Sequence, residues 1–176
     1  MNTTTLRDAY DSLLNAAAEV ADSLDPTPDP PAGEWNADQI LSHVALVNAA
    51  TITAISTVAS GIHTTYDNRI ASDTWTIAHQ IVLTGGNEGL RDRIRRQADA
   101  LSALAPMLSE TELDTPVSAR LLSNDTLLVD QPLPLRAIIT GLADAELPGH
   151  TAQLLALLRQ PATADGRSAA LPELIA

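Results

Sequence analysis

The chain has 176 residues, 45% of them hydrophobic, which is enough for one domain with a well-buried core. Its 22 acidic residues outnumber 10 basic ones and give a net charge of −12 at pH 7. Such a field repels phosphate backbones, so we expect no nucleic-acid partner. Cysteine is absent, which excludes a disulfide framework, a thiolate zinc site and a thiol nucleophile of the protein's own.

The sequence also argues against a membrane location. No uninterrupted apolar run approaches the roughly 18 residues of a membrane span. The polar start MNTTTLRD is unlike a signal peptide. We therefore expect a cytoplasmic protein without a membrane partner.

The first half of the chain has the periodicity of helices. Apolar residues recur at three- and four-residue steps from Leu6 to Leu24, and a proline cluster at 26–31 then ends this helix. A second helix is expected to begin after Asn36 and to run to about Ser60. Its start is well marked, because Asn36 can cap the helix and Gln39 can reach back to the backbone of Asn36.

Two further helices are predicted after residue 61. A short helix is expected from Ser72 or Asp73 to Leu83. A third long helix opens at Asn87, and its apolar stripe extends from Leu90 to Leu108. Each of these segments has one apolar face, which predicts packing against a shared core.

The pattern changes before the last helix. Two β-prone runs flank Ser123-Asn124-Asp125 and predict a small β-hairpin. The predicted strands are residues 117–122 and 126–129. Pro132 and Pro134 are expected to end the hairpin and lead into a last long helix that reaches about Arg159.

These elements predict an all-α fold, a four-helix bundle with a small β-hairpin insertion before the last helix. Residues 1–160 are expected to form this single domain. Residues 161–176 are expected to be a C-terminal tail, partly disordered or docked on the bundle. The apolar stretch Leu171–Ile175 could serve an interface in a homodimer.

Three polar residues interrupt the apolar faces of these helices. In the last helix Glu146 and His150 stand four residues apart on the stripe that otherwise carries leucine and isoleucine. In the second helix His43 lies on the same side as Ile40 and Val44. Burying a carboxylate and two imidazoles without partners costs several kcal/mol. A divalent metal satisfies all three, and the set suits catalytic zinc or non-haem iron.

Two observations leave other interpretations open. Pro148-Gly149 lies between the two candidates of the last helix, and a proline there kinks or widens a helix. Glu146 and His150 could also form only a buried ion pair, with His43 as a hydrogen-bond partner.

At these residues the chain resembles the DinB-like bundles, and among them the N-terminal domain of mycothiol-dependent maleylpyruvate isomerases. The matching pieces are GEWNADQILSH at 33–43 and ELPGHTAQLL at 146–155. The first resembles the family's tryptophan-led helix start that ends in a ligand histidine. The second resembles its H-x-x-x-H-x-x-Q-L segment, with Glu146 at the first histidine position, as in the isomerase branch.

The resemblance implies a divalent metal held by His43, Glu146 and His150, with zinc the usual ion and nickel or iron as alternatives. It also implies a small-molecule thiol cosubstrate, mycothiol in actinobacteria, that attacks an electrophilic substrate. The expected activity is thiol-dependent isomerisation or thiol transfer. The alternative is a non-catalytic metal- or ligand-binding bundle.

Two further side chains are weaker candidates. His79 shares a stripe with Trp75, Val82 and Leu83 and could lie over the mouth of the site, where it could support the metal ligands or act as an acid or base. A packing or interface role is the alternative for His79. Arg136 could meet an anionic substrate or the carboxylate of the thiol, and solvent exposure is its alternative.

Overall fold

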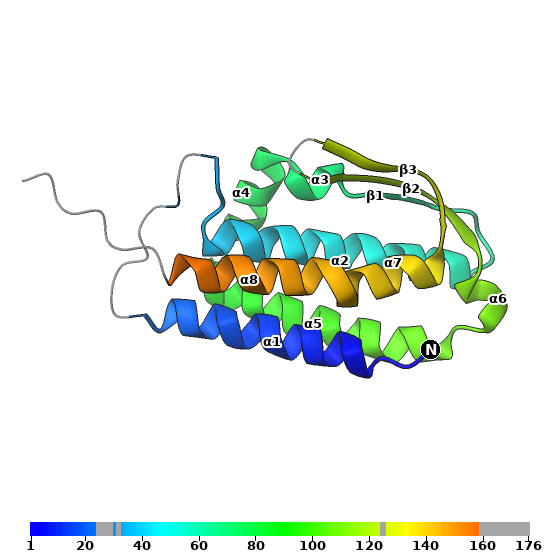
Figure 1. Cartoon of the computed structure of the whole chain (residues 1–176), viewed down its shortest axis with the longest axis horizontal. Coiled ribbons are helices and arrows are strands. Elements are labelled where there is room, and N and C mark those ends of the chain that lie inside the picture. The colour runs from blue at the N-terminus through cyan, green and yellow to red at the C-terminus, as the bar shows by residue number, and fades with distance from the viewer. Residues whose placement is uncertain (24–29, 31–32, 124–125, 159–176) are drawn as a thin grey trace, which may run out of the picture.

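The computed structural model describes residues 1–23, 30, 33–123 and 126–158. The molecule is mostly helical with one small sheet, and its long helical segments run side by side (Figure 1). Three of them are α1 (Thr4–Ala21), α2 (Ala37–Ala59) and α5 (Asn87–Leu104). The last consists of α7 (Leu135–Gly141), the π-helical turn η2 (Leu142–Glu146) and α8 (Leu147–Leu157). The predicted helical class is confirmed.

The start of α2 forms as its sequence predicts. The Gln39 amide N–H donates to Asn36 Oδ1 at 3.0 Å, and the Asn36 N–H donates to Gln39 Oε1 at 2.9 Å. This reciprocal capping box satisfies two N–H groups that a helix start leaves without partners. It also fixes the first turn of the helix that carries His43.

A crossover between α2 and α5 contains three short elements. They are β1 (Thr65–Asp67), the single-turn helix α3 (Arg69–Ser72) and α4 (Thr74–Thr84). The predicted short helix is confirmed as α4, which Asp73 caps by accepting from the Thr76 N–H at 2.8 Å. Gly85, with φ of 80°, ends it in the left-handed conformation that glycine favours.

The predicted hairpin is confirmed and is longer than expected. Its strands are β2 (Pro116–Ser123) and β3 (Thr126–Pro134), and β1 pairs with β2 in parallel on the other side. The expectation that Pro132 and Pro134 end the hairpin is confirmed for Pro134, which is the last residue of β3 before α7, and is wrong for Pro132, which lies within the strand. β3 is an edge strand, where a residue without an N–H is tolerated. After α5 the chain reaches β2 through η1 (Ala105–Met107) and α6 (Glu110–Leu113).

One hydrophobic core joins the long helices and the sheet. α2 packs against α5, α1 against α8, and the sheet covers α2 (Figure 1). Among the described residues α2 is the one helix long and apolar enough to cross a membrane by length and composition, and 61% of its most apolar window is buried inside the protein. Core helices pass the same test. The first helix is shorter than expected, because α1 ends at Ala21 and not at Leu24. The expected tail at 161–176 lies outside the described residues.

Candidate metal centre

The first candidate ligand lies in the middle of the structure. His43 is on the buried face of α2 between Ile40 and Val44, and it is 6% exposed. Its Nε2 atom lies 2.8 Å from Glu146 Oε1, across a sequence separation of 103 residues. The inward orientation expected for His43 is therefore confirmed.

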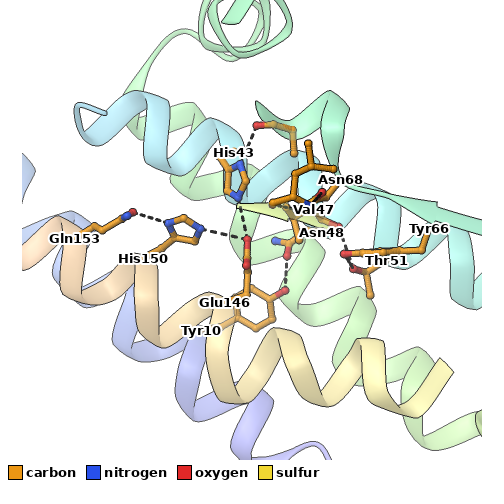
Figure 2. Close-up of polar contacts among 12 residues, drawn as sticks. Tyr10, His43, Val47, Asn48, Thr51, Tyr66, Asn68, Glu146, His150 and Gln153 are labelled. Carbon is orange, nitrogen blue, oxygen red and sulfur yellow. Dashed lines mark hydrogen bonds and ion pairs between the residues drawn. The ribbon is translucent and has the colours of Figure 1, made fainter. Parts of the chain in front are cut away.

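Glu146 and His150 come together at the junction of η2 and α8. His150 Nε2 lies 3.2 Å from the same carboxylate oxygen that His43 approaches (Figure 2). The side chain of Glu146 is 32% exposed and that of His150 is 12% exposed. The structure thus brings together the three residues that interrupt the apolar stripes.

Pro148 does not spoil this alignment. The helix widens just before it, because the Leu147 N–H donates to the Leu142 carbonyl five residues back. Pro148 has no N–H and stands within the first two residues of α8, where helices tolerate proline. The predicted widening is confirmed. Glu146 is the last residue of the widened turn and His150 lies in α8, and the two side chains still meet at a four-residue spacing. π turns of this kind often occur at functional sites.

Hydrogen bonds on the far side of each ring fix the orientation of the histidines. His43 Nδ1 lies 2.8 Å from the Ala71 carbonyl oxygen, and His150 Nδ1 lies 2.7 Å from Gln153 Oε1. Both partners are acceptors, so each Nδ1 carries a hydrogen and donates. In a neutral ring the Nε2 atom then presents a lone pair. Both lone pairs point toward a carboxylate oxygen.

Three acceptors that converge in this way require a positive partner between them. A proton on each Nε2 supplies it, and so does a bound cation. The ligand atoms of His43, Glu146 and His150 all lie within 4.8 Å of one another. This is close to the spacing of ligands held about 2 Å from one ion, and two histidines with one carboxylate is a ligand set of catalytic zinc. The cluster could therefore hold a metal ion.

The carboxylate is ionised in this setting. Burial by itself raises the pKa of Glu146, but the hydrogen bonds and positive charges of His150 and His43 outweigh burial and hold that pKa well below its usual range. Glu146 thus carries a negative charge at neutral pH. One negative charge beside two imidazoles suits a divalent cation.

An aromatic ring covers the cluster. The Trp35 ring centroid lies 4.8 Å from that of His43 and 6.5 Å from that of His150. Trp35 precedes the capping box of α2, so the same helix start that positions His43 positions the indole. The two histidine rings lie 4.7 Å apart. The indole therefore lies beside both histidine rings.

A buried polar network extends from this region into the core, and sequence analysis did not identify it. The Tyr10 hydroxyl donates to Asn48 Oδ1 at 2.6 Å. The Thr51 hydroxyl donates to the Val47 carbonyl at 3.0 Å, so the Tyr66 hydroxyl, 3.2 Å from Thr51 Oγ1, is the donor between them (Figure 2). Burial raises the pKa of Tyr66 to about 12, and the nearby charge of Glu146 adds to this. Two aromatic hydroxyls therefore stay protonated near the cluster.

His79 is not brought into the cluster. It is exposed on α4 and stacks on Trp75, with ring centroids 4.9 Å apart. Its stripe faces solvent, since Trp75, Val82 and Leu83 are 70%, 78% and 68% exposed. The buried face of α4 carries Ile77 and Gln80 instead. The sequence correctly places His79 on one helix face with Trp75, Val82 and Leu83, but that face is exposed to solvent.

Arg136 has partners within the protein. Its Nε donates to Asp114 Oδ1 at 2.6 Å and its Nη2 donates to Glu110 Oε2 at 2.7 Å. These pairs join the start of α7 to α6. Arg136 precedes Glu146 by ten residues, which is about 15 Å along a helix axis. The Arg136 side chain is 38% exposed, which agrees with the solvent-exposed alternative, and its guanidinium pairs with two carboxylates of the protein.

Comparisons with protein-family models, with curated proteins and with solved structures found no significant match to this chain.

Proposed function

We propose that the protein is a metal-dependent enzyme of the thiol transferase or thiol-dependent isomerase type, built on a DinB-like four-helix bundle. His43, Glu146 and His150 are the proposed metal ligands, and zinc is the proposed ion. A small-molecule thiol of the mycothiol type is the proposed cosubstrate, which would react with a small electrophile. The sequence resemblance at 33–43 and 146–155 supports the choice of family.

The observation that carries the metal proposal is the orientation of the two rings. Ala71 and Gln153 accept the Nδ1 hydrogens, which leaves both Nε2 atoms directed at one oxygen of Glu146. Hydrogen bonds to the second ring nitrogen are typical of histidines that ligate metals, because they fix the tautomer. A simple ion pair needs only one oriented histidine, whereas this arrangement orients two.

The composition supports the thiol cosubstrate. The chain contains no cysteine, so any thiol chemistry at this centre uses a sulfur from another molecule. A bound divalent cation acts as a Lewis acid and lowers the pKa of a thiol, which is the chemistry the metal would supply here.

The protein's own residues would hold and enclose that centre. Glu146 balances part of the cation's charge, while Ala71 and Gln153 keep His43 and His150 in the ligating tautomer. Trp35 restricts water on one side of the rings. Glu146 and His150 are the more exposed members of the cluster, so a small molecule would approach from the α8 side.

Metal analysis tests the first part of the proposal. Protein purified without added metal should contain close to one equivalent of a transition metal, and His43→Ala should lose most of it. His79→Ala is the matched control, because it removes an exposed histidine outside the cluster and should leave the metal content unchanged. Less than a tenth of an equivalent in the wild-type protein, unchanged by His43→Ala, would overturn the proposal.

Thiol assays test the second part. Mycothiol added with zinc should raise the melting temperature above that with zinc alone, and the protein should consume thiol in the presence of small electrophiles. Glu146→Gln should abolish that turnover. A metal-loaded protein that shows neither the thermal shift nor turnover would be a non-catalytic metal-binding bundle, which is the alternative function.

A further inference from the structure

Asn68 connects the sheet to the short helix beside the metal centre. Its side-chain Nδ2 donates to the Leu122 carbonyl at 2.9 Å, and the Leu122 N–H donates to Asn68 Oδ1 at 2.8 Å. Its own backbone N–H donates to the Arg120 carbonyl at 3.3 Å. Asn68 follows β1 directly, so its amide side chain extends the parallel pairing of β1 with β2 beyond Asp67. Both of its side-chain hydrogen-bonding atoms are engaged by one residue of the hairpin.

The other side of Asn68 leads to His43. The Asn68 carbonyl accepts the Ala71 N–H at 2.9 Å, and the Ala71 carbonyl accepts from His43 Nδ1 at 2.8 Å. Ala71 is 1% exposed and His43 is 6% exposed, so little solvent reaches this path. A continuous series of hydrogen bonds thus runs from Leu122 of the hairpin through Asn68 and Ala71 to His43, and from there to Glu146.

The helix in the middle of this series cannot hold its own position. α3 spans only Arg69–Ser72, and one isolated turn of helix is unstable in water. Its place is set by its contacts with α2, α4 and β2. The two side-chain hydrogen bonds of Asn68 to Leu122, together with the bond from its N–H to the Arg120 carbonyl, join the start of α3 to β2. The Ala71 carbonyl that meets the imidazole lies three residues after Asn68.

We propose that Asn68 is a positioning residue that couples the β2–β3 hairpin to the metal centre. It holds the Ala71 carbonyl against His43 Nδ1, and so the attachment of the hairpin regulates how well His43 presents Nε2 to a metal. This inference rests on the proposed function for its effect on the metal, but the link from Asn68 to His43 belongs to the metal-free protein as well.

The test compares Asn68→Ala with Asp130→Ala. Asn68→Ala removes both hydrogen bonds to Leu122, whereas Asp130→Ala removes an exposed ion pair with Arg120 within the same hairpin. In metal-free protein, NMR of the imidazole nitrogens reports the Nδ1 hydrogen of His43, assigned by its loss in His43→Ala. We expect Asn68→Ala to weaken the protection of that hydrogen from exchange and to lower the affinity for Zn²⁺ by about 10-fold. Asp130→Ala should change neither.

A second variant guards against loss of folding. Asn68→Asp keeps the shape of the side chain and the acceptor for the Leu122 N–H, but it loses the donor to the Leu122 carbonyl. It should shift both measurements in the same direction, and it decides the question if Asn68→Ala does not fold. Folded Asn68 variants with wild-type exchange of the His43 hydrogen would overturn the coupling. If wild-type protein binds no Zn²⁺, the proposed function fails, and the metal-free NMR measurement still decides the coupling.

Discussion

A single residue contributes most to stability where a buried polar atom has one hydrogen-bond partner and no access to solvent. Asn48 is fully buried and accepts from the Tyr10 hydroxyl, and its own amide donates to Gln97 Oε1 at 3.3 Å. Gln97 in turn donates to the Ala45 carbonyl at 2.9 Å. This network lies where α1, α2 and α5 meet. It fixes their relative positions with directional bonds in an otherwise apolar interior.

We expect Tyr10→Phe to lower the free energy of unfolding by about 1–3 kcal/mol, because Asn48 Oδ1 would lose its donor in a site without solvent. Urea unfolding followed by circular dichroism measures this. The double variant Tyr10→Phe with Asn48→Leu serves as the control and should cost less than the sum of the two single changes. Strict additivity of the two costs would show that the hydroxyl and the amide do not interact.

At the scale of elements, the last helix owes its phase to the π turn η2. A π turn adds a residue to one turn of helix, which rotates all that follows relative to α7. Pro148 supports the turn because it cannot donate to a carbonyl of the preceding turn. Gly149 follows it, and an added Cβ there would have no atom within 4 Å. A substitution at Pro148 therefore tests the backbone hydrogen bonding of the turn, whereas one at Gly149 only adds a side chain where there is room for it.

We expect Pro148→Ala to lower the affinity for Zn²⁺ by about 10-fold while the melting temperature stays the same or rises. Alanine restores an N–H and favours a regular α-helix, which would rotate Glu146 away from His43. Calorimetric titration with Zn²⁺ measures the affinity. Gly149→Ala should stabilise the helix by about 0.5–1 kcal/mol and keep the wild-type affinity. Equal Zn²⁺ affinities for both variants would contradict a role of the π turn at the site.

The elements that sequence analysis predicted are those with local signals. The capping box at Asn36, the Asp73 cap and the glycines after helices mark their ends by chemistry within a few residues. β1 gave no such signal, because three residues show no periodicity and its partner strand lies about fifty residues away. The stripe around His79 was predicted as a unit, but periodicity does not say whether a face meets the core or solvent.

The candidate site likewise has parts that leave a local signal in the sequence and parts that depend on how distant segments pack. Glu146, His150 and His43 were identified because each interrupts an apolar stripe, and the structure brings them together. The Ala71 carbonyl was not identifiable, since a backbone acceptor leaves no mark in the sequence. In the sequence Trp35 was noted only as part of a motif that begins a helix. Its contact with both histidine rings depends on how α2 and α8 pack.

At the scale of the whole molecule, the only two tyrosines of the chain report on global unfolding. Tyr10 is 1% exposed and Tyr66 is 6% exposed. Burial raises the pKa of Tyr10 above its ordinary value, with a smaller contribution from Tyr66. Burial also raises the pKa of Tyr66 to about 12. Neither phenol can ionise readily while the core is intact.

We expect stability to fall as the pH rises from about 10 toward 12. In this range the unfolded chain releases the phenolic protons and the folded chain keeps them, so the unfolded state binds fewer protons and is favoured. For Tyr66 alone the loss approaches about 3 kcal/mol. Phenolate absorbance near 295 nm should therefore appear together with the loss of helical circular dichroism. Phenolate absorbance in a protein that is still fully helical would contradict the burial of both rings.

The distance along the chain between the two halves of the proposed metal centre has a consequence for the order of folding. His43 and Glu146 are 103 residues apart, and each lies on a helix whose stability depends on packing against the other helices of the domain. The two side chains therefore meet only after the whole domain has assembled. A metal ion would act late, by mass action on the finished fold, and would raise the stability in proportion to the logarithm of its free concentration. The apoprotein should accordingly fold without metal, unlike a zinc finger.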